Sequence, residues 1–304
     1  MKRRVIQIAE STQLISLPRK WCIANNIKKG DELEVEEQGT KISVTAKDEG
    51  AKVEQIKIDA EGYGLFTLRS IAAIYKAGYD EVEIRFKTSE NLEQLPKFLN
   101  EDLPGYEVFD HSEHRYLIKA ISRETPEEFD PALRRIFLMA VSMGQSISAL
   151  LKEPKSDVHK LNNIIAMEIT INRLCNFCQR LLNKRGYKLY KKTSFIYTII
   201  WEIEKYCDEL KYIAQYMRDH PKAKFGTESI ELFEQSTTLF ELFYNEFYKF
   251  NESSVGVIAQ KRKDIIGKAH VMLEKGKDAT LVHHALVMTQ MIFNMQGSVM
   301  GLLF

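Results

Sequence analysis

The chain has 304 residues, of which 44% are hydrophobic and 28% are charged, and its formal net charge is +1. This length predicts two or three domains, and the near-neutral charge excludes a general attraction to nucleic acid or membrane, so any such affinity must come from local clusters. No apolar run of about 20 residues and no signal peptide are expected, and the four cysteines suit a reducing compartment, which predicts a cytoplasmic protein without membrane insertion.

Short strands around one helical turn are expected in residues 1–47. Alternation of apolar and polar side chains predicts strands near residues 5–9, 14–17, 33–35 and 42–44, and Pro18 suits the start of a short helix. A mostly β segment of this size cannot bury a stable core alone. A second copy of the chain is therefore the simplest partner for its apolar strands.

Basic residues gather at the start of the chain. Seven lysines and arginines stand against only Glu10 in the first 29 residues, whereas five acidic residues follow between Asp31 and Glu37. Pairing two chains would double the basic cluster on one surface, and each cation that reaches a DNA phosphate releases counterions. The segment therefore predicts a DNA-binding module or, as the alternative, a dimerisation hairpin whose charges are only solvated.

Two motifs in this segment resemble the AbrB/SpoVT family of swapped-hairpin DNA-binding domains. They are residues 15–20 (ISLPRK) and residues 27–35 (IKKGDELEV), and the resemblance covers about the first 47 residues. It implies an intertwined homodimer that contacts DNA with basic residues of the first strand and the following loop. The candidate contacts at the corresponding positions are Lys2, Arg3, Arg4, Arg19 and Lys20.

Residues 48–125 predict a small α/β connector domain. The first of its two helices is expected to end at Gly78, and the second to be interrupted or bent near Pro96. Glu61 to Gly64 lacks the lysine and the Ser/Thr of a phosphate loop, so no nucleotide site is expected there. The strands are expected at residues 53–58, 81–86, 106–109 and 115–120, and the helices at residues 65–77 and 92–99.

From residue 127 to the end, the pattern predicts an all-α domain. Short breaks between helices imply antiparallel neighbours, and six helices of similar length indicate two copies of a three-helix unit. Asp130 is expected to be the N-cap of the first helix, with Pro131 as its first helical residue. The six helices are expected at residues 131–152, 156–184, 189–219, 227–250, 253–275 and 278–303.

Polar side chains stand at helical spacing in the second and third of these helices. Glu204 and Asp208 are four residues apart, so both can reach one cation, and Glu168 has Asn172 at the same spacing. The alternative is a solvated face with Lys205 and Lys211 nearby. Cys175 and Cys178 have no second Cys or His pair, so they are expected to be buried core residues rather than a zinc site.

This helical region resembles PhoU, the family of phosphate-uptake regulators, whose domains are paired three-helix repeats with acidic Glu-x-x-x-Asp motifs. The resemblance implies a candidate divalent or ferric metal ion at Glu168, Glu204 and Asp208. The corresponding pair in the last helix, Gln290 and Asn294, keeps the spacing but lacks the charge. The order of the modules and residues 72–84 are similar to archaeal-type PhoU proteins with an AbrB-like head.

The expected fold is therefore an α+β multidomain protein with a swapped-hairpin domain, an α/β domain and a bundle of two three-helix repeats. The expected function is a homodimeric, DNA-binding regulator of phosphate uptake or phosphate homeostasis whose helical domain binds a transporter or signalling protein. The alternative is an adaptor that never binds DNA and acts by protein contact. No nucleophile–base pair or nucleotide loop is recognisable, so an enzyme is not expected.

Overall fold

The computed structural model describes residues 2–8, 11–38, 41–45, 53–88, 92–122, 125–153 and 157–304. The chain forms two compact units, Met1–Glu54 and Gln55–Phe304. Its mixed α+β composition, with small sheets followed by a long helical region, agrees with the predicted class. The predicted α/β and helical domains pack together within the second unit, and the division at residues 125–127 stays a prediction.

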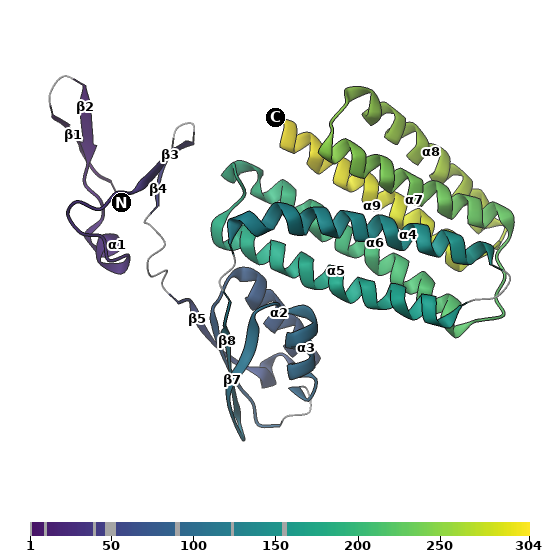
Figure 1. The fold of residues 1–304 in the computed structure, drawn as a ribbon, viewed down its shortest axis with the longest axis horizontal. Coiled ribbons are helices and arrows are strands. Elements are labelled where there is room, and N and C mark those ends of the chain that lie inside the picture. Colours follow the sequence, from purple (N-terminus) through teal and green to yellow (C-terminus); the bar gives the residue numbers. More distant parts are fainter. Residues whose placement is uncertain are drawn as a thin grey trace. The chain divides into compact units, whose positions relative to one another are not determined.

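The first unit consists of two antiparallel hairpins with a short helix between them (Figure 1). Strands β1 (Val5–Ile8) and β2 (Thr12–Ile15) form one hairpin, and β3 (Glu34–Gln38) and β4 (Lys41–Thr45) form the other. Helix α1 (Arg19–Ala24) begins directly after Pro18, whose ring fixes φ at a value compatible with a first helical turn. These elements confirm the predicted strands and helical turn.

The α/β part is a four-stranded sheet in the order β5-β6-β8-β7. Strands β5 (Gln55–Asp59) and β6 (Glu81–Arg85) are parallel and joined by helix α2 (Thr67–Ala77), which ends at Gly78 with φ of +101°, as the sequence predicts. Strands β7 (Tyr106–Ser112) and β8 (Arg115–Ala120) complete the sheet, and helix α3 (Leu95–Asp102) precedes them. Pro96 lies in the first turn of α3, where it costs no hydrogen bond, so the helix begins beside Pro96 rather than at residue 92 and does not bend there.

The six predicted helices are all present. The first, α4, begins at Phe129 rather than Pro131 because a 3₁₀ turn precedes it, closed by a 3.2 Å hydrogen bond from the Thr125 N–H to the Glu128 carboxylate. Asp130 therefore lies inside the helix, and its predicted N-cap role is wrong. The helices are α4 (Phe129–Lys152), α5 (Val158–Arg185), α6 (Thr193–Asp219), α7 (Thr227–Tyr248), α8 (Glu252–Glu274) and α9 (Ala279–Leu303).

The helices pack in two groups of three. Helices α4, α5 and α6 contact one another, as do α7, α8 and α9, and the groups join through contacts of α6 with α9 and of α4 with α7. The fully buried rings of Phe137, Tyr206, Phe240 and Phe243 fill the junction, and Tyr206 stacks on Phe240 at 4.2 Å between ring centroids. Figure 1 shows α4, α5 and α6 lying alongside one another, with α7 and α9 next to them.

Helix α9 is, by length and composition, apolar enough to cross a membrane, and it is the one such helix among the described residues. It contacts α6, α7 and α8, and Val282, Met288, Ile292 and Met295 along it are fully buried. Because 33% of its apolar window is buried in this way, packing accounts for part of the apolarity of α9. The cytoplasmic location stays a prediction.

Candidate functional site

The five candidate DNA contacts lie at one end of the β1–β2 hairpin. Val5 pairs with Ile15, so the chain before Val5 and the chain after Ile15 leave the hairpin at the same end. Arg4 directly precedes Val5, and Arg19 is four residues beyond Ile15. An extended chain spans at most about 3.5 Å per residue, so Arg4 and Arg19 stay within roughly 25 Å of each other, and Lys2 and Lys20 within roughly 35 Å.

The candidate contacts are open to solvent. All five side chains are exposed, and no ion pair joins any of them to a described residue. The acidic strand β3 belongs to the other hairpin, where Glu34 and Glu37 are also exposed. Glu10, the single acid within the basic segment, lies outside the described residues. The basic end of the β1–β2 hairpin thus offers positive charge that no partner in the described chain neutralises.

The hairpins carry large apolar side chains that no described residue of their own unit buries. Val5 and Ile15 form a cross-strand pair on one face of β1–β2 and are 62% and 58% exposed. Ile6 and Leu14 form the next pair, which points to the opposite face because side chains alternate along a strand, and they are 55% and 45% exposed. No described side chain of this unit is buried.

The three candidate metal ligands are held by lysines. The Lys211 ammonium lies 2.6 Å from a carboxylate oxygen of Glu168 and 2.6 Å from one of Asp208, so it joins α5 to α6. The Lys205 ammonium lies 2.9 Å from Glu204 and 3.1 Å from Asp208. Asn172 donates its amide N–H to Glu168 at 2.7 Å. Three carboxylates and two ammonium groups form one partly buried network, the carboxylate cluster.

Burial and charge act against each other in the carboxylate cluster. Burial raises the pKa of Glu168, and its hydrogen bond to Lys211 only partly offsets this. Burial also pushes the pKa of Asp208 upward, but the Lys211 ammonium, the hydrogen bond with Glu168 and the Lys205 charge together outweigh burial and hold that pKa below its usual value. Burial lowers the pKa of Lys211, yet the bonds to Asp208 and Glu168 prevail and raise it. The cluster therefore stabilises the charged forms of Asp208 and Lys211 but disfavours the ionised form of Glu168.

These residues do not fit a metal ion as they stand. No group of three or more His, Cys, Asp or Glu side chains among the described residues converges on one point. The position that a cation would share between Glu168 and Asp208 is taken by the Lys211 ammonium. In the last helix, Gln290 accepts a 2.8 Å hydrogen bond from Arg262 instead. The sequence-based metal expectation at Glu168, Glu204 and Asp208 is untested. A metal ion there would have to displace both lysines, so we expect none to bind to the cluster as it stands.

One buried group was missed from the sequence. Arg180 is fully buried on α5, and its guanidinium donates to the carbonyl oxygens of Tyr75 at 2.8 Å and Tyr79 at 2.6 Å and to Asp80 at 2.8 Å. Lys184 reaches the same carboxylate oxygen of Asp80 at 2.5 Å. The contacts tie the C-terminal end of α2 to α5. A lone arginine beside a buried apolar run was the only signal, and its partner is 100 residues away.

The cysteines are confirmed as core residues. Cys175, Cys178 and Cys207 are buried with free thiols, and burial raises the pKa of each. A buried thiol with a raised pKa is a poor nucleophile and a poor metal ligand.

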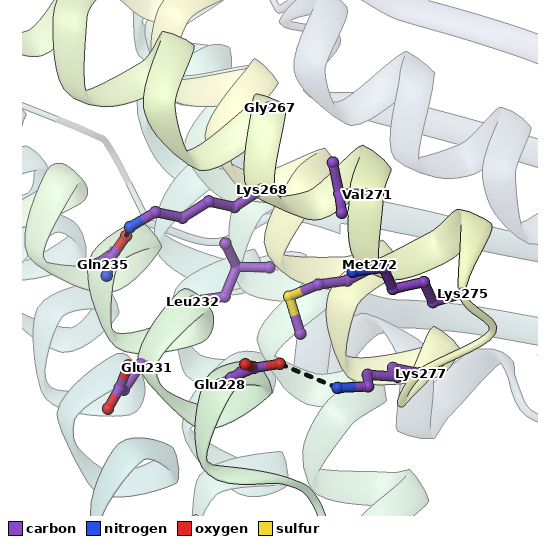
Figure 2. Close-up of a pocket in the computed structure, with 10 residues that line it drawn as sticks. All are labelled: Glu228, Glu231, Leu232, Gln235, Gly267, Lys268, Val271, Met272, Lys275 and Lys277. Carbon is purple, nitrogen blue, oxygen red and sulfur yellow. Dashed lines mark hydrogen bonds and ion pairs between the residues drawn. The ribbon is translucent and has the colours of Figure 1, made fainter.

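An open groove of about 460 Å³ lies between α7 and α8. Figure 2 shows Leu232 and Met272 between the two helices, with Glu228 and Lys277 facing each other at one end. These two form a 3.2 Å ion pair, and Lys268 donates to Gln235 at 3.1 Å at the other end. These pairs occupy three of the charged groups that line the groove, and the remaining charges, Glu231 and Lys275, have opposite signs, so the lining does not favour one sign of ligand charge.

Comparison with known proteins adds no relative to these observations. No family model, no curated protein and no solved structure matches the chain.

Proposed function

We propose that the chain is a homodimeric, DNA-binding regulator in which two copies of the N-terminal unit join and present their basic residues to a duplex. The proposal depends on two features that occur together in the N-terminal unit. The strands of its β1–β2 hairpin expose apolar side chains, and one end of this hairpin carries cations without ion-pair partners among the described residues. Burial of the apolar side chains would favour dimerisation, and the cations would bind DNA phosphates.

The apolar side chains support pairing with a second copy. Burying one Val, Leu or Ile side chain contributes about 1.5–3 kcal/mol, and an isolated two-stranded hairpin is marginal in water. Both faces of the β1–β2 hairpin carry apolar side chains, so a second chain that packed against only one face would leave the other exposed to solvent. An intertwined pair of hairpins covers both faces, which is the swapped-hairpin architecture that the sequence predicts.

The basic end supports DNA binding by the pair. Lys2, Arg3, Arg4, Arg19 and Lys20 in each copy would give a dimer ten cations near one surface. If all of them contact phosphate, log K for a duplex falls with log salt with a slope of about −9. Binding of this kind is largely independent of DNA sequence, and base-specific contacts would add to it.

The helical region supports the regulatory half of the proposal. Two groups of three helices, joined through α6 with α9 and α4 with α7, are the arrangement expected of paired PhoU-type repeats. By that resemblance, the helical region would bind a phosphate transporter or a signalling protein, and the regulated process would be phosphate uptake or phosphate homeostasis. In the adaptor alternative, the helical region binds the same kind of partner protein, but the chain does not bind DNA.

The test is a binding titration of the full chain against a labelled duplex of random sequence, with anisotropy as the readout. We expect binding that weakens by roughly 10³- to 10⁵-fold between about 50 and 200 mM salt. The quadruple variant Arg3→Gln, Arg4→Gln, Arg19→Gln, Lys20→Gln should lose most of the affinity and most of the salt slope.

A matched control changes the same number of exposed cations on the helical region. Lys222, Lys224, Lys261 and Lys263 are exposed on or beside α6 and α8, and replacing all four with glutamine should leave duplex binding unchanged. Absence of binding at low salt by a dimeric wild-type chain would favour the adaptor. Equal losses in the two quadruple variants would show that net charge alone, and not the hairpin, attracts DNA.

A further inference from the structure

A second pocket, separate from the groove between α7 and α8, opens at one end of the helical region. It has a volume of about 760 Å³ and lies where the first turn of α4, the connection from α5 to α6, and the C-terminal ends of α7 and α9 meet. Pockets that hold small organic molecules range from about 300 to 1,000 Å³. This pocket, called here the end pocket, therefore has the size of a ligand site.

The floor of the end pocket is apolar. Leu133 on α4 and Val299 on α9 are buried, and Phe247 and Leu302 beside them are half-buried. Tyr187 and Tyr248 stand at its sides, and burial raises the pKa of both hydroxyls, so they stay neutral over a wider pH range. Such a surface favours a hydrocarbon or aromatic body over a small inorganic ion.

The rim of the end pocket carries more positive than negative charge. Arg134 stacks over the Tyr248 ring at 5.5 Å, and no ion pair joins its guanidinium to a described residue. The Lys192 ammonium donates to the neutral carbonyl oxygen of Leu302. Only Lys188 has a carboxylate partner, Asp130, at 2.5 Å. Two cations at the rim thus lack a counter-charge from the described chain.

A buried carboxyl group, that of Glu246, also lines the end pocket. Glu246 is 2% exposed, accepts a 2.5 Å hydrogen bond from the Gln296 amide, and has a second oxygen that is buried without a partner. Burial raises the pKa of Glu246, so its carboxyl group keeps its proton to higher pH than an exposed glutamate.

We propose that the end pocket binds an organic monoanion with an apolar body, such as a medium-chain or aromatic carboxylate, whose charge pairs with Arg134 and Lys192 at the rim. The body lies on Leu133, Val299 and Phe247, away from water. A carboxylate pairs with the guanidinium of Arg134 through two parallel hydrogen bonds. This site is independent of the DNA-binding proposal and is tested without DNA.

The experiment is a calorimetric titration of the full chain with octanoate below its micelle concentration. Octanol and octylammonium serve as probes with the same chain length and no negative charge. We expect saturable binding of octanoate to one site per chain, and binding of octanol and octylammonium that is weaker by at least about tenfold. Arg134→Gln should weaken octanoate binding by about tenfold or more, because it removes a charged hydrogen-bond donor.

Two further variants separate the end pocket from general hydrophobic binding. Leu303 lines the pocket and is exposed, so Leu303→Trp fills the opening without disturbing the core, and octanoate binding should be lost. Lys268→Gln, in the groove between α7 and α8, should leave binding unchanged. The proposal is overturned if octanoate does not saturate, if octanol binds as tightly, or if Arg134→Gln and Lys268→Gln have equal effects in chains with unchanged helical circular dichroism.

Discussion

Replacing Arg180 with methionine removes the guanidinium that joins α5 to the end of α2. The change leaves two carbonyl oxygens, those of Tyr75 and Tyr79, without the donor that reaches them at 2.8 and 2.6 Å. It also removes the 2.8 Å ion pair with Asp80. Methionine has a similar length and is apolar, so the buried volume between the rings of Tyr75 and Tyr106 stays filled.

The loss in the free energy of unfolding depends on how many partners the Asp80 carboxylate keeps. Breaking a buried ion pair by removing one partner typically costs about 3–5 kcal/mol. Because Lys184 still reaches Asp80 at 2.5 Å, its carboxylate keeps one cation, and we expect the lower end of the range, about 3 kcal/mol.

The assay is urea unfolding of the full chain, followed by circular dichroism of the helices. With a slope of about 3 kcal/mol per molar urea, Arg180→Met should lower the midpoint by about 1 M. Arg173→Met is the control, since Arg173 lies on the same helix but is exposed, and it should leave the midpoint nearly unchanged. Equal midpoints for the two variants would refute the view that Arg180 holds the α/β part on α5.

Three further predictions follow from the helical region. The Glu246→Gln variant should become more stable relative to the wild type as pH rises above about 4.5. The reason is that the pKa of Glu246 is raised in the folded chain, so ionisation of this carboxyl group destabilises the wild type. A difference in urea midpoint that stays constant from about pH 4 to 8 would contradict this prediction. Calorimetry should detect no saturable Mn²⁺ binding, since lysines already neutralise Glu204 and its neighbours; uptake that is abolished by Glu204→Gln with Asp208→Asn would restore the metal hypothesis. Gly267→Ala should stabilise the chain by about 0.5–1 kcal/mol, because the new Cβ would meet open space. Gly144→Leu should destabilise it by about 1–3 kcal/mol, because Thr237 lies 3.0 Å from the Cβ position. Equal urea midpoints for the two variants would contradict both predictions.

The elements of the fold were largely predictable because their signals are local. The six long helices repeat their apolar residues over many turns, and the strands of the α/β part alternate clearly, so their positions agree within a few residues. The ends of the helices were less predictable than their positions. Helix α4 begins before its expected cap, because Thr125 and Glu128 form a turn that competes with Asp130. Helix α3 begins beside Pro96 instead of at residue 92.

The candidate sites were less predictable, since their chemistry depends on residues distant in the sequence. Glu204 and Asp208 were recognisable as a pair, but Lys211 reaches Glu168 across 43 residues, and this contact turns an apparent cation site into an ion-pair network. Arg180 and Asp80 could not be paired from the sequence. The basic N-terminal residues were visible from charge alone, and the structure adds that both basic segments leave the hairpin at one end.

The most direct test of the central claim is the mass of the full chain in solution, measured by sedimentation. The account predicts a particle of twice 35.2 kDa that becomes a monomer when Ile6→Glu and Leu14→Glu place charge on one face of the hairpin. Leu138→Glu with Val257→Glu, on exposed positions of α4 and α8, should leave it a dimer. A wild-type monomer, or a dimer that survives the hairpin substitutions, would contradict the account.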